Sequence, residues 1–260
     1  MVGFSELSKL NTFSMEDVFA LVGNKKTASS LVLRLSKKGL VKKIKNNLYS
    51  CVNLASGSVI ASRYHIACGI NDTAYLSHHS AFEYAGITNQ VYYEVYVSSS
   101  RKFNDFEFEG ISYKYVSSKM DTGIEIPTNT QGIRLTSMER TVIDSIKDFE
   151  NIAGLEELLN CITSIPYVDE KKLISFLDAY HIQFLYQKTG FILEHYQNQL
   201  QLSDDFIDYC KTKTGKSTRY LTKDSKTYYS PWRLVIPGGL FGLIEQGGNP
   251  LTIGDGSFLL

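Results

Sequence analysis

The chain has 260 residues, of which 27 are basic and 27 acidic, so its formal net charge is zero. Hydrophobic residues make up 43% and charged residues 21%, and only 5 prolines occur, which excludes an extensively disordered chain. No run of about 18 apolar residues occurs, and the N-terminus lacks a basic segment followed by an apolar one. We therefore expect a cytoplasmic protein with no membrane-spanning helix and no signal peptide.

The N-terminal residues predict two short helices. Residues 4–10 are expected to form the first. Ser14 is a favourable N-cap for the second, because its hydroxyl can accept a hydrogen bond from the first turn. Phe13 and Val18 stand at the two positions of a hydrophobic staple around that cap. Gly23 then begins a compact turn into the next segment.

Residues 24–50 concentrate positive charge. This segment holds eight basic residues and neither Asp nor Glu, whereas the rest of the chain holds 19 basic and all 27 acidic residues. A short basic segment on an acidic body is the electrostatic footprint of a surface that binds a polyanion.

The same segment predicts a helix followed by a hairpin. Apolar residues recur at i, i+3, i+4 and i+7, which is one face of a helix: Ala28, Leu31, Val32 and Leu35. Either Asn24 or Thr27 is expected to cap this helix, and Gly39 to end it. Residues 40–45 and 48–52 predict two strands around the turn Asn46-Asn47.

The order helix, helix, turn, basic helix, basic hairpin is typical of a winged helix-turn-helix, which we expect over residues 1–55. Residues at the N-terminal end of a recognition helix reach base edges in the major groove, and Arg34 has the best chemistry for guanine. The hairpin, or wing, would contact phosphates or the minor groove. The candidate DNA-binding residues are Lys25, Lys26, Thr27, Ser29, Ser30, Arg34, Lys37, Lys38, Lys42, Lys43, Lys45, Asn46 and Asn47.

Residues 56–260 predict an α+β domain that is rich in strands to about residue 150 and helical after it. In the first part we expect a small antiparallel sheet flanked by helices. The expected elements are helices over 56–70 and 74–87, a strand over 91–98, a hairpin over 103–117 turning at Glu109-Gly110, a strand over 132–136, and a helix capped by Ser137.

The last part predicts four amphipathic helices, at about residues 155–162, 169–180, 184–200 and 203–210. Pro166 is expected to stop the first, and Asp169 and Ser203 to cap the second and fourth. Residues 218–237 predict a late hairpin, followed by a short segment over 239–247. Residues after Pro250 are expected to fray.

No catalytic residue, metal site or cofactor site is expected. The phosphate loop GxxxxGK[ST], the motif GxGxxG and the elbow GxSxG are all absent. The neighbours His78 and His79 would point about 100° apart on a helix, so we expect packed or capping histidines rather than metal ligands. The four cysteines form no CxxC pair and are expected to be buried: Cys51, Cys68, Cys161 and Cys210.

Two acidic positions invite a nuclease interpretation. Glu170-Lys171-Lys172 forms an ExK triplet, which in metal-dependent nucleases lies on a strand with another acid before it. Here the triplet opens a predicted helix, so we expect a solvated face. Asp144 is likewise expected to be an exposed or capping acid.

The order of three segments resembles the AbiEi family of antitoxins, which belong to bacterial type IV toxin–antitoxin and abortive-infection systems. These segments are GLVKKIKNNLYS (39–50), LSHHSAFEYAGIT (76–88) and GIRLTSMERTVIDSI (132–146), and the later RYL and PWRLVIPGGLF also fit. The resemblance spans nearly the whole chain, and it implies an N-terminal winged helix with an α+β C-terminal domain.

The resemblance also implies two activities. The winged helix would bind inverted repeats in the double-stranded DNA upstream of its own operon and repress it. The C-terminal domain would counter an AbiEii-like nucleotidyltransferase toxin without needing a stable complex with it. The toxin's own signature, Gly-Ser followed by paired acids on a strand, is absent. The family supplies no defined catalytic residues.

Two other functions compete with this one. The chain can be a solitary winged-helix regulator with an effector-binding domain, and the neighbouring gene would distinguish this from an antitoxin. It can also be an enzyme, such as a nuclease, that uses DNA binding only for targeting. Metal-dependent cleavage would reveal that third function.

Overall fold

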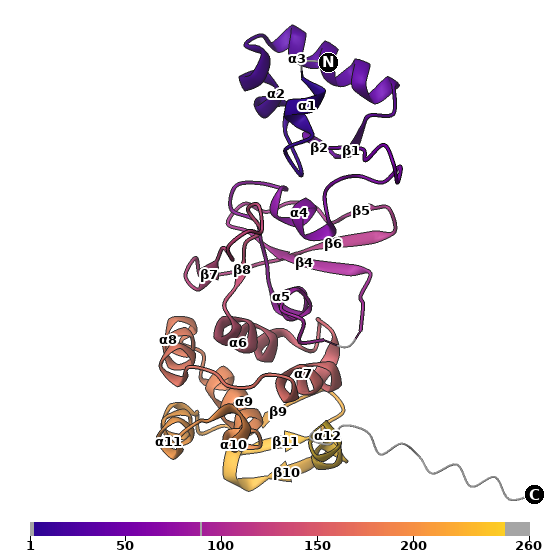
Figure 1. Cartoon of the computed structure of the whole chain (residues 1–260). Helices are drawn as coiled ribbons and strands as arrows, with labels where there is room; N and C mark the ends of the chain where they lie inside the picture. The colour runs from indigo at the N-terminus through magenta and orange to yellow at the C-terminus, as the bar shows by residue number, and fades with distance from the viewer. Residues whose placement is uncertain (1–2, 89, 248–260) are drawn as a thin grey trace, which may run out of the picture. The chain divides into compact units, whose positions relative to one another are not determined.

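The computed structural model describes residues 3–88 and 90–247, and it has an α+β fold (Figure 1). The chain divides into two compact units. Unit 1 comprises Met1–Tyr84 and Gln90–Ser137, and unit 2 comprises Ala85–Asn89 and Met138–Leu260. Residues 1–55 therefore belong to the same compact unit as the strand-rich segment, and the predicted boundary at residue 55 stays a prediction.

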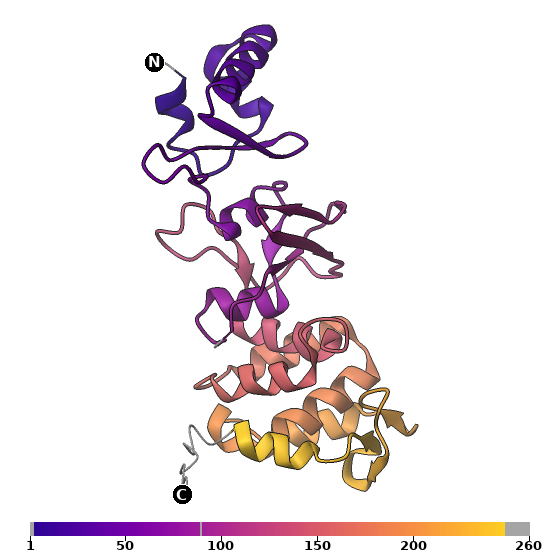
Figure 2. The same cartoon turned by 90° about the vertical axis from the view of Figure 1, so that its right-hand side faces the viewer.

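Unit 1 begins with three helices and a hairpin, coloured indigo to purple in Figures 1 and 2. These are α1 (Phe4–Leu7), α2 (Met15–Val22), α3 (Lys25–Lys37), β1 (Val41–Lys45) and β2 (Leu48–Cys51). Ser14 caps α2 in a capping box with Asp17. Asn24, rather than Thr27, caps α3, because its side-chain oxygen accepts from the Thr27 backbone N–H at 3.1 Å. The helices and the hairpin predicted for this segment are confirmed, although α1 ends at Leu7 rather than at residue 10.

The apolar faces of these elements form one buried cluster. It contains both staple residues and the whole predicted stripe of α3: Leu7, Phe13, Val18, Ala28, Leu31, Val32, Leu35, Val41 and Cys51. Gly39 follows α3 with a positive φ of 69°, a conformation that glycine adopts without a steric penalty. The chain thereby turns directly into β1, which pairs antiparallel with β2.

The rest of unit 1 is built on a six-stranded sheet with the order β5-β6-β4-β3-β8-β7. The strands are β3 (Tyr75–Leu76), β4 (Glu94–Ser98), β5 (Phe106–Phe108), β6 (Ile111–Val116), β7 (Ile124–Glu125) and β8 (Leu135–Thr136). The prediction of an antiparallel sheet is correct only in part, because the sheet is mixed. The pairs β3–β4, β5–β6 and β7–β8 are antiparallel, whereas β4 pairs parallel with β6 and β3 pairs parallel with β8. After β4, residues 99–105 lead the chain to β5, which lies at the edge of the sheet. The next strand, β6, then lies between β5 and β4.

Two predicted helices in this unit are shorter than expected. The first, α4, spans only Arg63–Cys68. The residues before it form a turn that the Asn53 side chain stabilises, and Val59 then pairs with Val52 in an isolated bridge, so this segment is not helical. Ser62 then caps α4. The second, α5, spans His78–Tyr84 and begins only after the buried strand β3.

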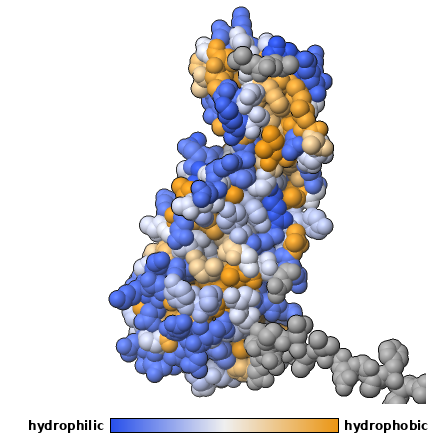
Figure 3. Space-filling model, viewed as in Figure 1, coloured by the Kyte–Doolittle hydropathy of each residue, from blue (hydrophilic) through white to orange (hydrophobic). Residues whose placement is uncertain are grey.

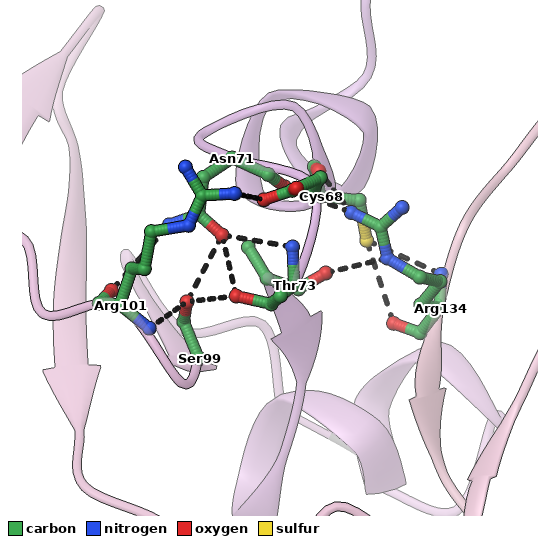
Figure 4. Close-up of polar contacts among 8 residues, drawn as sticks. Cys68, Asn71, Thr73, Ser99, Arg101 and Arg134 are labelled. Carbon is green, nitrogen blue, oxygen red and sulfur yellow. Dashed lines mark hydrogen bonds and ion pairs between the residues drawn. The ribbon is translucent and has the colours of Figure 1, made fainter.

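A polar network joins the end of α4 to the sheet (Figure 4). The Asn71 side-chain oxygen accepts from the Thr73 and Ser99 hydroxyls, both at 2.9 Å. The Arg134 guanidinium donates to the carbonyl oxygens of Ala74 and Cys68 at 2.7 and 2.5 Å. The two bonds from Arg134 satisfy backbone carbonyl oxygens that the short helix α4 and the short strand β3 leave without partners, so the network has a structural role.

Unit 2 is mainly helical. Its helices are α6 (Met138–Asp148), α7 (Gly154–Thr163), α8 (Glu170–Tyr180), α9 (Gln183–Glu194), α10 (Gln197–Leu200), α11 (Asp204–Lys213) and α12 (Leu240–Gly247). The four predicted helical patterns are confirmed, although the one over 184–200 is divided into α9 and α10. Asp169 and Ser203 cap their helices as predicted.

The predicted late hairpin is instead a three-stranded sheet with the order β10-β11-β9. It comprises β9 (Arg219–Tyr220), β10 (Thr227–Tyr229) and β11 (Leu234–Ile236), with the 3-10 helix η1 (Ser230–Trp232) between the last two. β9 pairs parallel with β11, a contact that alternation alone does not encode. The predicted fraying after Pro250 lies outside the described residues.

Trp232 packs this sheet onto α9. A Cβ on Gly190 would lie 2.1 Å from the Trp232 ring, so only glycine allows this approach. The indole N–H donates to Glu194 Oε2 at 2.6 Å.

Among the described residues, no helix is long and apolar enough to cross a membrane.

Candidate nucleic-acid interface

Helix α3 presents its polar residues to solvent. The predicted residues Lys25, Lys26, Thr27, Ser29, Ser30, Arg34 and Lys37 all lie on α3 and are exposed, as is its C-cap Lys38. Within residues 3–88 and 90–247, the side chains of Lys26, Arg34, Lys37 and Lys38 make no ion pair or hydrogen bond. The charge of these four cations is therefore available to an external anion.

The hairpin presents its lysines differently. Lys42 Nζ lies 2.6 Å from Glu109 Oε1, in the turn between β5 and β6. Lys45 Nζ lies over the Phe103 and Phe106 rings, 4.9 and 4.5 Å from their centroids, and burial lowers the pKa of Lys45. The remaining hairpin lysine, Lys43, is exposed. Two of the three predicted wing lysines are thus engaged within unit 1.

The hairpin turn is tied to the start of α2. Asn47 has a φ of 57°, its side-chain oxygen accepts from the Met15 backbone N–H at 3.0 Å, and its amide donates to Glu16 Oε2 at 2.8 Å. That hydrogen bond is the largest of the causes that hold the pKa of Glu16 below its usual range; the charge of Lys25 contributes less. Both asparagines of the turn are exposed, but these hydrogen bonds occupy the Asn47 side chain, so Asn46 rather than Asn47 is available to a ligand.

A hollow of about 320 Å³ lies between α2 and α3, lined by Met15, Glu16, Phe19, Lys25, Ala28 and Ser29. Phe19 is 40% exposed, so the hollow combines an apolar wall with a cation. The hollow adjoins the N-terminal half of α3. A ligand that contacts Lys25 and Ser29 therefore also lies at the rim of the hollow.

Sequence reasoning missed Leu33, which is 58% exposed on α3. The signal was present in the sequence. Leu31, Val32 and Leu33 are three consecutive apolar residues, and only the first two fit the buried stripe. Figure 3 shows hydrophobic and hydrophilic residues side by side on the surface of the N-terminal segment.

The adjacent histidines of unit 1, His78 and His79, are packed. His78 and His79 are 2% and 3% exposed. The His78 ring nitrogen lies 2.9 Å from Ser77 Oγ, and the His79 ring packs against Tyr92 with centroids 4.0 Å apart. The four cysteines are buried and form no disulfide among themselves, as expected of small hydrophobic residues.

The prediction that Asp144 is exposed or capping is wrong. Asp144 is 2% exposed within unit 2, where it accepts from Arg140 Nε at 3.3 Å and from the Tyr180 hydroxyl at 2.5 Å. Burial and the charge of Asp144 raise the pKa of Tyr180. The i, i+4 pair with Arg140 compensates two charges inside a helix bundle, which is a structural role.

The solvated-face interpretation of the ExK triplet holds for two of its residues. Lys171 and Lys172 are exposed, whereas Glu170 is partly buried and accepts from the backbone N–H and hydroxyl of Ser203.

Lys188 is a buried cation of unit 2. Its ammonium group donates a hydrogen bond to the Lys147 carbonyl oxygen at 2.9 Å, and burial lowers the pKa of Lys188 to about 8.

Comparisons with known proteins give a structural relative but no family. No protein-family model matches the chain, and no curated protein matches it. The chain is similar in structure to the RV2827C protein from Mycobacterium tuberculosis, with a TM-score of 0.66 and 12% sequence identity. The match covers 95% of this chain and 93% of that protein, and at this identity it concerns the fold alone.

Proposed function

We propose that the chain is a DNA-binding antitoxin that represses its own operon through a winged helix-turn-helix formed by residues 1–55. Helix α3 is the recognition helix and β1–β2 is the wing. The observation that carries the proposal is the exposed cationic face of α3, whose cations Lys26, Arg34, Lys37 and Lys38 lack internal partners among the described residues.

The electrostatics support double-stranded DNA as the ligand. Each phosphate contact by a Lys or Arg releases counterions, so several unpaired cations on one helix produce salt-dependent binding. The capped N-terminus of α3 carries Lys25, Lys26 and Thr27, where a recognition helix contacts base edges. The body outside residues 24–50 has eight more acidic than basic residues, which disfavours DNA contact elsewhere.

The antitoxin part of the proposal rests on the resemblance of the three segments to the AbiEi family. In this proposal, residues 56–260 counter a nucleotidyltransferase-like toxin in the cytoplasm, and no stable complex with it is required. The proposal assigns the chain no catalytic residue and no cofactor.

A reporter gene tests the DNA-binding part. DNA upstream of the gene is fused to a fluorescent reporter, and the full chain is supplied from a second plasmid. The full chain is expected to repress the reporter, and K26A/R34A is expected to relieve that repression. K171A/K223A is a matched control, because it removes two exposed lysines of unit 2 and should repress normally. Equal repression by all three proteins would contradict the proposal.

Growth rescue tests the antitoxin part separately. The toxin encoded beside the chain is induced, and the full chain and K26A/R34A are co-expressed in turn. Both should restore growth, because the proposal assigns neutralisation to residues outside α3. Loss of rescue by both proteins would instead favour a solitary regulator. Metal-dependent cleavage of the upstream duplex would favour a nuclease.

A further inference from the structure

Leu33 is an apolar residue on the solvent-exposed side of α3. The buried face of α3 is formed by Ala28, Leu31, Val32 and Leu35, and Leu33 projects from nearly the opposite side of the helix. It is 58% exposed, whereas the four residues of the stripe are at most 6% exposed. Contacts within the described part of the chain therefore bury less than half of the Leu33 side chain.

The neighbours of Leu33 on the helix surface are polar and cationic. Residues three and four apart lie side by side on a helix, which places Ser29, Ser30 and Lys37 around Leu33. Lys26 lies two turns before it on the same face, and all four residues are exposed. An isolated leucine is thus centred on the cationic face assigned to DNA.

We infer that Leu33 is a specificity-determining residue that contacts the C5-methyl group of thymine in the major groove. This inference rests on the proposed DNA-binding function. The charge around Leu33 selects a polyanion as the occupant of this face, and the thymine methyl is the apolar group that DNA displays in the major groove. Lys37 contacts the phosphate backbone, and Leu33 distinguishes A·T from G·C pairs at one position.

The expected effect is modest and measurable. Removing one methyl group from an apolar contact costs about 0.8 kcal/mol, which is about fourfold in affinity. The upstream duplex is synthesised chemically with either thymidine or deoxyuridine at every T position, so that the second duplex lacks every thymine methyl but keeps its base pairing. The full chain should bind the thymine duplex about fourfold more tightly for each methyl contacted.

Leu33→Ala assigns the effect to this residue. The variant should bind both duplexes with nearly equal affinity, because the side chain that senses the methyl is gone. Leu54→Ala is a matched control: Leu54 is 73% exposed but lies outside α3, so its variant should keep the full preference for thymine. Circular dichroism tests whether both variants are folded, and sedimentation compares their oligomeric state with that of the unmodified chain.

The outcomes separate this inference from the proposed function. Specific binding with a thymine preference that disappears in Leu33→Ala supports the inference. Specific binding with no thymine preference, or a preference that persists in Leu33→Ala, overturns the inference and leaves the DNA-binding function intact. A change in self-association on replacing Leu33, with the preference unchanged, assigns the side chain to a contact between copies and also overturns it. Failure to distinguish the upstream duplex from a scrambled one contradicts the proposed function itself.

Discussion

Helix α3 and the hairpin β1–β2 follow one another in the chain and carry the same kind of charge, but they present it in different ways. On α3, Lys26, Arg34 and Lys37 extend into solvent without internal partners among the described residues. On the hairpin, Lys42 pairs with Glu109, and Lys45 lies over two phenylalanine rings. The density of lysine in a sequence therefore overstates the charge that a ligand can use.

This difference assigns different tasks to the two elements. A side chain with no internal partner loses no contact when it binds DNA, whereas Lys42 and Lys45 must exchange an existing contact for a phosphate. We therefore expect α3 to supply most of the affinity and sequence preference. The hairpin is expected to contribute mainly through Lys43 and Asn46.

The largest expected effect is that of Arg34→Ala. Loss of a guanidinium that reads a base should weaken binding to the upstream duplex by about 1–3 kcal/mol and change binding to a scrambled duplex much less. Fluorescence anisotropy on both duplexes measures the two values. Lys171→Ala, which removes an exposed cation of unit 2, serves as control. An equal loss on both duplexes would reassign Arg34 to a phosphate.

Asn47 provides a test of the hairpin's structural role. Asn47→Ala should lower the free energy of unfolding by about 1–2 kcal/mol, because it removes the hydrogen bonds to Met15 and Glu16 and places alanine at positive φ. Asn47→Gly removes the same hydrogen bonds without the conformational penalty and should cost less. Urea unfolding measures both, and equal costs would show that the backbone conformation contributes nothing.

Lys43 and Lys45 allow a comparison within one strand. Lys45→Gln should lower stability by about 0.5–1 kcal/mol, since it removes the contact with Phe103 and Phe106. Lys43→Gln should leave stability unchanged and reduce by about one the slope of log affinity against log salt. The pair is measured by urea unfolding and by anisotropy in a salt series. The reverse pattern would show that Lys45, and not Lys43, contacts phosphate.

The smallest expected effect is that of Glu109→Gln. The Lys42–Glu109 pair is exposed, so its loss should change the free energy of unfolding by no more than about 0.5 kcal/mol. It should also release Lys42 for DNA and steepen the salt dependence by up to about one phosphate contact. A shallower salt dependence in this variant would mean that the pair holds the hairpin in its binding geometry.

Local structure was largely predictable because it is set by neighbouring residues. The cap Ser14, the left-handed Gly39 and the turn Glu109-Gly110 each act over a few residues, and each lies where the sequence places it. The stripe of α3 also predicts its own burial. The exposed Leu33 follows from the same stripe, although it was recognised only in the structure.

Features that depend on distant residues were not predictable from pattern alone. Alternation does not encode strand direction, so the parallel pairing of β4 with β6 was missed. The partners of Lys42 and Lys45 lie more than 50 residues away, on or beside β5 and its following turn. Asp144 is polar in the sequence, and only its contacts with Arg140 and Tyr180 explain why it is buried.

The most direct test of the central claim is fluorescence anisotropy of the full chain on the DNA upstream of its own gene, across a salt series and against a scrambled duplex of equal composition. The account predicts tighter binding to the upstream duplex that persists near physiological salt and is lost in Arg34→Ala. Equal binding to both duplexes that disappears as salt rises would contradict it. In that case α3 would be only a generic basic surface.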